Sequence, residues 1–269
     1  MASPRFRVPA LVGGVLLALV GCAGPAAQDP TPSAPAGPSS SAALPPPVPL
    51  AERCAGAIPA GAEQRTLTAS DGTVLNSAWL GSGGTVAVLL HQTDGDGLCG
   101  FLFYADYLAQ QGLKVALLDV CGYGQSSCLG SPLADDPVAQ VKVITDAARA
   151  DSAQRVVLVG ASMGGSTAVS AAATVKADAI VDLSGPAVFE GSDVAADAKH
   201  VTMPALFAFA HSDESDLVAV KAQLSKMPSK QKTFLTYDTG HGYDLLRDLS
   251  SLEFTPLAAR VSQFAQGQS

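Results

Sequence analysis

Residues 156–165 read VVLVGASMGG, an apolar run of mostly β-branched residues that stops at Gly160 and then places Ser162 between small residues. The small residues that follow, 166–173, are compatible with a helix. This pattern predicts a strand, a sharp turn and a helix. A turn that holds a serine in a strained backbone conformation leaves no room for bulky neighbours, which explains Gly160 and Gly164. A serine held in this way presents its hydroxyl at the edge of a sheet, where a base can reach it.

Segments typical of strands and helices alternate on both sides of this turn. Continuous apolar runs predict buried strands, and apolar residues at helical spacing predict helices between them. The expected strands are 85–90, 114–119, 156–160, 179–184, 204–210 and 232–237, and the expected helices are 101–111, 137–150, 215–227 and 254–264. Two further strands, 65–69 and 73–80, flank a Ser70-Asp71-Gly72 turn that is typical of a hairpin. Alternation of this kind predicts an α/β fold with a mostly parallel central sheet and helices on both faces.

The N-terminus has the pattern of an export signal. Arg5 and Arg7 precede an apolar run over residues 8–20, which is too short to span a bilayer as a mature helix. The run leads into Cys22 in a pattern that resembles the bacterial lipoprotein box, which implies a signal peptide at residues 1–21 and a lipid on Cys22. An ordinary secretory signal is the alternative. We therefore expect an exported lipoprotein, bound to the cell membrane on its extracytoplasmic side.

Composition divides the remainder of the chain. Residues 22–50 are rich in proline, alanine and serine, which predicts a disordered tether, and residues 51–269 are expected to form one folded domain. The whole chain has a formal charge of −8, and the part after residue 21 has a charge of −10, from 14 basic and 24 acidic residues. A chain with this charge has no electrostatic reason to bind nucleic acid.

Four cysteines follow Cys22. An even number of cysteines in an exported chain favours disulfides. Cys121 and Cys128 flank one loop, so we expect them to pair, and we expect Cys54 to pair with Cys99; free buried thiols are the alternative. No cysteine lies at the turn around Ser162, no spacing is typical of a metal site, and no cofactor is implied.

Five stretches taken in chain order resemble the α/β-hydrolase superfamily, and the resemblance covers about Thr66 to Phe264. They are His91-Gln92, residues 119–126, the Gly160-x-Ser162-x-Gly164 turn, the strand that leads to Asp213, and Gly240-His241-Gly242. The resemblance implies an α/β-hydrolase fold in which Ser162 is the nucleophile. A serine hydroxyl needs a base to accept its proton, and the family order of serine, acid and histidine makes His241 that base and Asp213 the acid that orients it.

Other residues remain alternatives for these roles. His211 is a rival base, and Asp216 and Asp182 are rival acids. We expect His91 to organise a loop, His200 to be exposed and Asp238 to lie in a turn. Four aromatic residues could line the mouth of a pocket or could equally be packing residues: Phe101, Tyr104, Tyr123 and Tyr243.

The superfamily stabilises a negatively charged oxygen with two backbone N–H groups. The residue after the nucleophile, Met163, supplies one of them in this family. The second is expected from the turn after His91, where the usual His-Gly is His91-Gln92. This departure leaves Gln92 and Thr93 as candidates, and we favour Thr93 because it follows the position of the family's glycine.

The connection between Gly185 and Pro204 is short, so little or no lid is expected. The chain is similar to small dienelactone-hydrolase-like and carboxylesterase members, and Ser162 in place of the cysteine of dienelactone hydrolases favours an esterase. These observations predict a serine hydrolase that cleaves carboxylic esters or related small acyl compounds. A peptidase or thioesterase on the same scaffold is one alternative. A non-catalytic, ligand-binding lipoprotein with this fold is another.

Overall fold

The structure is a computed structural model, and it describes residues 46–94 and 96–268. The predicted signal peptide, Cys22 and most of the predicted tether lie outside the described residues. The first helix, α1 (Leu50–Arg53), begins one residue before the predicted start of the domain, and Leu50 is buried. Within the described residues, no helix has the length and apolar character needed to cross a membrane.

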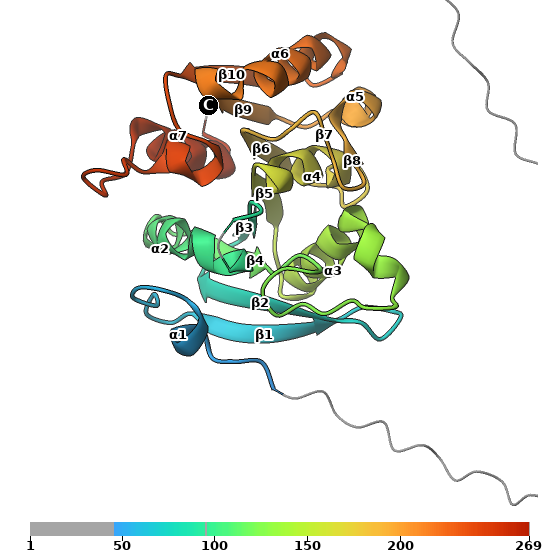
Figure 1. Cartoon of the computed structure of the whole chain (residues 1–269), viewed down its shortest axis with the longest axis vertical. Coiled ribbons are helices and arrows are strands. Elements are labelled where there is room, and N and C mark those ends of the chain that lie inside the picture. The colour runs from blue at the N-terminus through green and yellow to red at the C-terminus, as the bar shows by residue number, and fades with distance from the viewer. Residues whose placement is uncertain (1–45, 95, 269) are drawn as a thin grey trace, which may run out of the picture. The chain divides into compact units, whose positions relative to one another are not determined.

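An eight-stranded sheet occupies the centre of the domain, in the order β1-β2-β4-β3-β5-β6-β9-β10 (Figure 1). Strand β2 is antiparallel to both of its neighbours, and the pairs from β4 to β10 are parallel. The strands are β1 (Glu63–Thr68), β2 (Val74–Gly81), β3 (Thr85–Leu90), β4 (Lys114–Leu118), β5 (Arg155–Ala161), β6 (Ala179–Leu183), β9 (Ala205–Ala210) and β10 (Lys232–Tyr237). The prediction of a mostly parallel sheet is confirmed, and so is the hairpin, in which Thr68 pairs with Val74.

Helices cover both faces of the sheet (Figure 1). One face packs against α2 (Leu102–Gln110) and α7 (Pro256–Ala265), and the other packs against α3 (Pro137–Ala150), α4 (Met163–Ala171) and α6 (Glu214–Gln223). Alternate residues of β3 point to opposite faces, because successive side chains of a strand alternate. Ala87 and Leu89 therefore join the first core, and Val86 and Val88 join the second.

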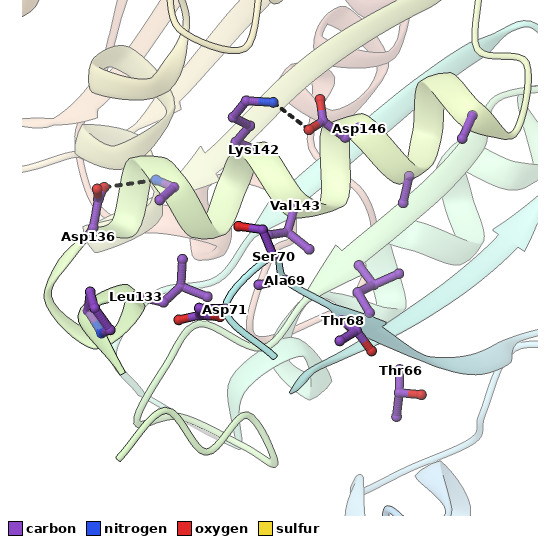
Figure 2. Close-up of a pocket in the computed structure, with 15 residues that line it drawn as sticks. Thr66, Thr68, Ala69, Ser70, Asp71, Leu133, Asp136, Lys142, Val143 and Asp146 are labelled. Atoms are coloured by element: carbon purple, nitrogen blue, oxygen red, sulfur yellow. Dashed lines mark hydrogen bonds and ion pairs between the residues drawn. The ribbon is translucent and has the colours of Figure 1, made fainter. Parts of the chain in front are cut away.

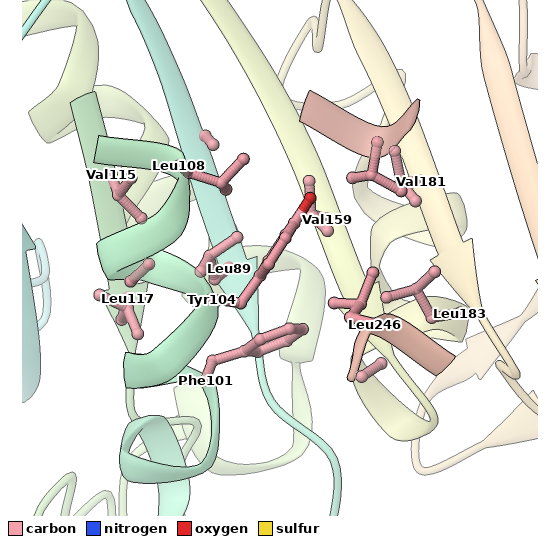
Figure 3. Close-up of a cluster of buried hydrophobic side chains, with 14 of the residues drawn as sticks. Leu89, Phe101, Tyr104, Leu108, Val115, Leu117, Val159, Val181, Leu183 and Leu246 are labelled. Atoms are coloured by element: carbon pink, nitrogen blue, oxygen red, sulfur yellow. The ribbon is translucent and has the colours of Figure 1, made fainter. Parts of the chain in front are cut away.

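The core beside α2 includes two of the four aromatic residues considered for the pocket mouth (Figure 3). Phe101 and Tyr104 are fully buried, and the Tyr104 hydroxyl donates to the carbonyl oxygen of Ala258 at 2.9 Å. Their role is packing between α2, the sheet and α7. Of the two alternatives left open for Phe101 and Tyr104, the structure therefore shows packing, whereas Tyr123 and Tyr243 are partly exposed.

The connection from β6 to β9 holds only small elements and no lid domain. It contains the hairpin of β7 (Val188–Phe189) and β8 (Ser192–Asp193), followed by α5 (Val194–Asp197). Single 3₁₀ turns complete the described elements: η1 (Gly97–Phe101), η2 (Pro132–Asp135), η3 (Ala198–His200), η4 (His211–Asp213), η5 (Leu224–Lys226) and η6 (Gly242–Leu246).

Both expected cysteine pairs are present. Cys54 lies against Cys99 with their Cα atoms 5.2 Å apart, and Cys121 lies against Cys128 with a Cα separation of 5.5 Å. The first pair fastens the end of α1 to η1, and the second closes the loop after β4.

Candidate active site

Ser162 occupies a strained turn between β5 and α4. Its backbone has φ 49° and ψ −119°, a left-handed conformation that is unfavourable for a residue with a side chain. A Cβ on Gly160 would overlap the carbonyl oxygen of Gly164, and a Cβ on Gly164 would overlap the carbonyl oxygen of Leu90. The two glycines are therefore required for the close approach of α4 to the sheet, as the sequence pattern predicts.

Three loops bring Ser162, His241 and Asp213 together at the carboxyl edge of the sheet. The Nε2 atom of His241 lies 2.8 Å from the Ser162 Oγ, and its Nδ1 atom lies 2.7 Å from Oδ1 of Asp213. The other carboxylate oxygen of Asp213 accepts the N–H of Ala210 at 3.1 Å. Because a carboxylate accepts, Nδ1 carries the ring proton, and Nε2 is left as the acceptor for the serine hydroxyl.

The rival residues lie elsewhere. His211 is exposed, and Asp216 accepts the N–H of Ala187 at 3.0 Å. Asp182 is fully buried and accepts the N–H of Gly185 at 2.7 Å. Burial, together with the charges of Asp216 and Asp213, raises the pKa of Asp182 to about 7. His200 and Asp238 are exposed. Within the described residues, none of these side chains contacts His241 through a hydrogen bond.

His91 organises the loop after β3. Its Nε2 atom accepts the N–H of Val120 at 3.1 Å, so Nδ1 carries the proton and donates to the carbonyl oxygen of Gln92 at 2.7 Å. His91 is 1 % exposed, and this burial lowers its pKa, which keeps the imidazole neutral. His91 thereby links its own loop to the end of β4.

The candidate oxyanion donors lie in the two loops beside the serine. Met163 is the first residue of α4, where N–H groups have no partner within the helix. In the part of the chain that the structure describes, neither Gln92 nor Thr93 donates its N–H to a backbone acceptor. Thr93 is exposed, whereas Gln92 is buried with its side-chain Oε1 accepting the N–H of Tyr243 at 3.2 Å.

Two hollows on the surface differ in their relation to this site. A recess of about 450 Å³ borders Met163 and is also lined by Val120, Gln140, Thr167 and Glu190. A wider groove of about 780 Å³ lies between β1 and α3 (Figure 2). Its labelled side chains include Thr68 and the Lys142–Asp146 ion pair. Ser162, Asp213 and His241 line neither hollow, and the recess is the one that borders Met163, the residue after Ser162.

The described residues contain no cluster of three or more histidine, cysteine or acidic side chains arranged to hold a metal ion.

One family model matches part of the chain. Residues 98–194 match the family model described as "Serine aminopeptidase, S33", a segment that includes Ser162 and ends before Asp213 and His241. No curated protein matches the chain in sequence.

Solved structures resemble the chain over most of its length. An esterase from Pyrococcus furiosus is 14% identical with a TM-score of 0.66, over 77% of this chain and 90% of that one. An α/β serine hydrolase without a lid from Xanthomonas campestris is 20% identical with a TM-score of 0.58, over 78% and 95% of the two chains. Dienelactone hydrolase from Anabaena variabilis is 18% identical with a TM-score of 0.58, over 77% and 96%.

These likenesses establish the architecture. The chain has the α/β-hydrolase fold with a mostly parallel central sheet, and its described residues include no lid domain. In this fold, the loops at the carboxyl ends of the strands carry the functional residues, and Ser162, Asp213 and His241 all lie there.

Proposed function

We propose that this protein is a serine hydrolase that cleaves carboxylic esters or related acyl compounds through an acyl-enzyme on Ser162. The observation that carries the proposal is the continuous hydrogen-bonded chain from the Ser162 Oγ through His241 to Asp213. A serine, an imidazole and a buried carboxylate in this order are the components of nucleophilic acyl transfer. The fold supports the same reaction class but does not select the leaving group.

The proposed mechanism uses each residue in one role. His241 Nε2 removes the hydroxyl proton as the Ser162 Oγ attacks the acyl carbon, and Asp213 stabilises the resulting imidazolium. The N–H groups of Met163 and Thr93 stabilise the oxyanion, helped by the N-terminus of α4. His241 then gives its proton to the departing alcohol. A water molecule, deprotonated by His241, releases the acid and restores the serine.

The recess beside Met163 supports a small substrate. It borders Met163, the residue after the proposed nucleophile, and its volume of about 450 Å³ lies toward the lower end of the range for ligand pockets, although Ser162 and His241 do not line it. Esters with short acyl or alcohol groups are therefore the proposed substrates. The matched family description, which names a serine aminopeptidase, favours a peptidase as the second candidate.

Active-site labelling tests this function. Full-length protein is treated with a fluorescent fluorophosphonate and assayed with p-nitrophenyl esters and an aminoacyl amide, beside Ser162→Ala and His241→Ala. Ser127→Ala, an exposed serine in the loop after β4, is the matched control. The proposal expects labelling and ester cleavage by the wild type and Ser127→Ala alone. A well-folded wild type that resists labelling would favour the non-catalytic binding protein.

We also propose that the protein is exported and anchored by a lipid on Cys22. The two cysteine pairs support an oxidising compartment, because disulfides persist mainly outside the cytosol. Cys22→Ala is expected to move the protein from the membrane fraction to a soluble or unprocessed form. If wild type and variant fractionate alike, the anchor on Cys22 is wrong.

A further inference from the structure

Tyr243 is held by two residues that lie on either side of Thr93. Its backbone N–H donates to Oε1 of Gln92 at 3.2 Å, and its hydroxyl donates to Oδ1 of Asp94. Tyr243 itself lies two residues after His241, at the start of η6. The loop that carries Thr93 is therefore fastened at two points to the turn that carries the histidine.

We propose that Tyr243 is a positioning residue for acyl transfer, which fixes the Thr93 N–H relative to His241 and Ser162 through its bonds to Gln92 and Asp94. This inference rests on the proposed function, since it assigns how the oxyanion site of that reaction is held. Donors that are fixed before the reaction stabilise a developing charge without reorganisation, so the rigidity of this loop affects the rate.

The Gln92 side chain packs against the turn that follows His241. Gly242 has φ 57°, and a Cβ at this position would overlap Oε1 of Gln92. The Gln92 side-chain amide thus occupies the space that a side chain at position 242 would need. A glycine in place of Gln92, as in the usual His-Gly pattern, would have no atoms for this contact or for the bond to the Tyr243 N–H.

The phenol ring of Tyr243 is held by packing on the other side. A Cβ on Gly100 would lie 2.7 Å from the Tyr243 hydroxyl oxygen, so the absence of a side chain there makes room for the ring. The rings of Phe101 and Phe103 contact it edge-on, with centroids 5.4 and 6.2 Å away. The hydroxyl is therefore aimed at Asp94 by contacts that do not depend on the hydrogen bond.

The hydrogen bond from Tyr243 to Asp94 also affects the electrostatics beside Thr93, because Asp94 is an acidic residue. A carboxylate next to Thr93 would oppose negative charge on a substrate oxygen, whereas a carboxylate that accepts from Tyr243 is drawn toward the phenol. Burial and the neighbouring Asp94 raise the pKa of Tyr243, so its hydroxyl stays protonated and continues to donate.

A double-mutant cycle tests the inference in the full-length protein. Tyr243→Phe and Asp94→Ala each remove one partner of the same hydrogen bond. We expect each to lower kcat for a p-nitrophenyl ester about tenfold with little change in KM, and the double variant to lose no more than either single variant. Tyr107→Phe, a partly buried tyrosine on α2, is the matched control. Asp94→Asn keeps an acceptor and is expected to restore most of kcat.

Inhibition by phenylboronic acid separates positioning from general stability. The Ser162 Oγ bonds to boron while its proton passes to His241, which gives a tetrahedral adduct that resembles the reaction intermediate. In Tyr243→Phe, the Ki of phenylboronic acid is expected to rise by the same factor as kcat falls. Both values are corrected for the fraction of protein in which the fluorophosphonate labels Ser162. If Tyr243→Phe is labelled normally by the fluorophosphonate and its Ki for phenylboronic acid is unchanged, the positioning role of Tyr243 is wrong, while the proposed hydrolase function stands. Absence of labelling in the wild type would instead overturn the proposed function, and this inference with it.

Discussion

Arg53 and Asp119 form a two-point ion pair that joins α1 to the end of β4. Nη1 of Arg53 lies 2.6 Å from Oδ2 of Asp119, and Nη2 lies 2.7 Å from Oδ1, with side chains 4% and 0% exposed. The carboxylate also accepts the N–H groups of Leu98 and Gln125. The pair therefore fastens the loops after β3 and β4, which border the proposed active site.

Replacing Arg53 is expected to destabilise the fold strongly. Arg53→Leu leaves the Asp119 carboxylate buried without its counter-ion, and breaking a buried pair in this way costs about 3 kcal/mol. Lys142→Leu is the matched control, because the Lys142–Asp146 pair is more than half exposed and contributes about 0.5 kcal/mol or less. Urea unfolding measures both changes. Equal losses would show that the Arg53 pair is no more important than a surface pair.

The two disulfides are expected to differ in their contribution. They close loops with sequence separations of 45 and 7 residues. Loop entropy in the unfolded chain gives about 4 kcal/mol for the first and about 2.4 kcal/mol for the second. Paired Cys→Ser variants at Cys54 and Cys99 should therefore lose more unfolding free energy than those at Cys121 and Cys128. A larger loss from the short loop would contradict this order.

Local signals in the sequence were sufficient for much of the fold. The helix predicted at 137–150 is α3, which begins at Pro137 where Asp136 accepts the N–H of Ala139 at 2.8 Å. Proline in the first turn and a preceding aspartate are start signals that depend only on neighbours in the chain. The β3 strand at 85–90 also has the predicted bounds, because a continuous apolar run is bounded by polar and small residues.

The remaining features depend on contacts between distant residues. Asp213 and Asp216 lie within one turn of each other, so spacing alone left both open, and only the bond to His241 distinguishes them. The contacts of Arg53 with Asp119 and of Gln92 with Tyr243 span 66 and 151 residues. No periodicity in the sequence reports such pairs. The sequence left Phe101 open between the core and the pocket mouth for a similar reason, since residue type does not distinguish a core face from a pocket mouth.

Asp213 gives a direct test of the proposed triad. Asp213→Asn retains the size of the side chain but can present an N–H to His241 Nδ1, which favours the wrong tautomer and leaves Ser162 without an acceptor. The expected loss in kcat is about 10³- to 10⁴-fold. Asp238→Asn, an exposed residue on the same loop as His241, is expected to stay within about twofold. Retention of activity by Asp213→Asn would move the acid role to another carboxylate.

The raised pKa of Asp182 predicts how the free energy of unfolding depends on pH. The carboxyl has an ordinary pKa of 3.8, and burial raises its pKa in the fold to about 7. Between these values the folded state keeps a proton that the unfolded state has released. The contribution of Asp182 to stability therefore decreases as the pH rises through this window, by up to about 1.4 kcal/mol per pH unit, and levels off above pH 7. His91 acts in the opposite sense, since its lowered pKa reduces stability as the pH falls.

Asp182→Asn separates these two effects, because His91 is common to both proteins. Asparagine is neutral at every pH, and its side-chain oxygen can still accept the N–H of Gly185. Any cost from its amide group, placed where Oδ2 of Asp182 has no partner among the described residues, is independent of pH. Urea unfolding at pH 5, 6, 7 and 8 should give a stability difference, variant minus wild type, that increases up to about pH 7 and is then constant. A difference that is the same at pH 5 and pH 8 would mean that Asp182 is ionised in the fold throughout, and that its buried charge is compensated by neighbours.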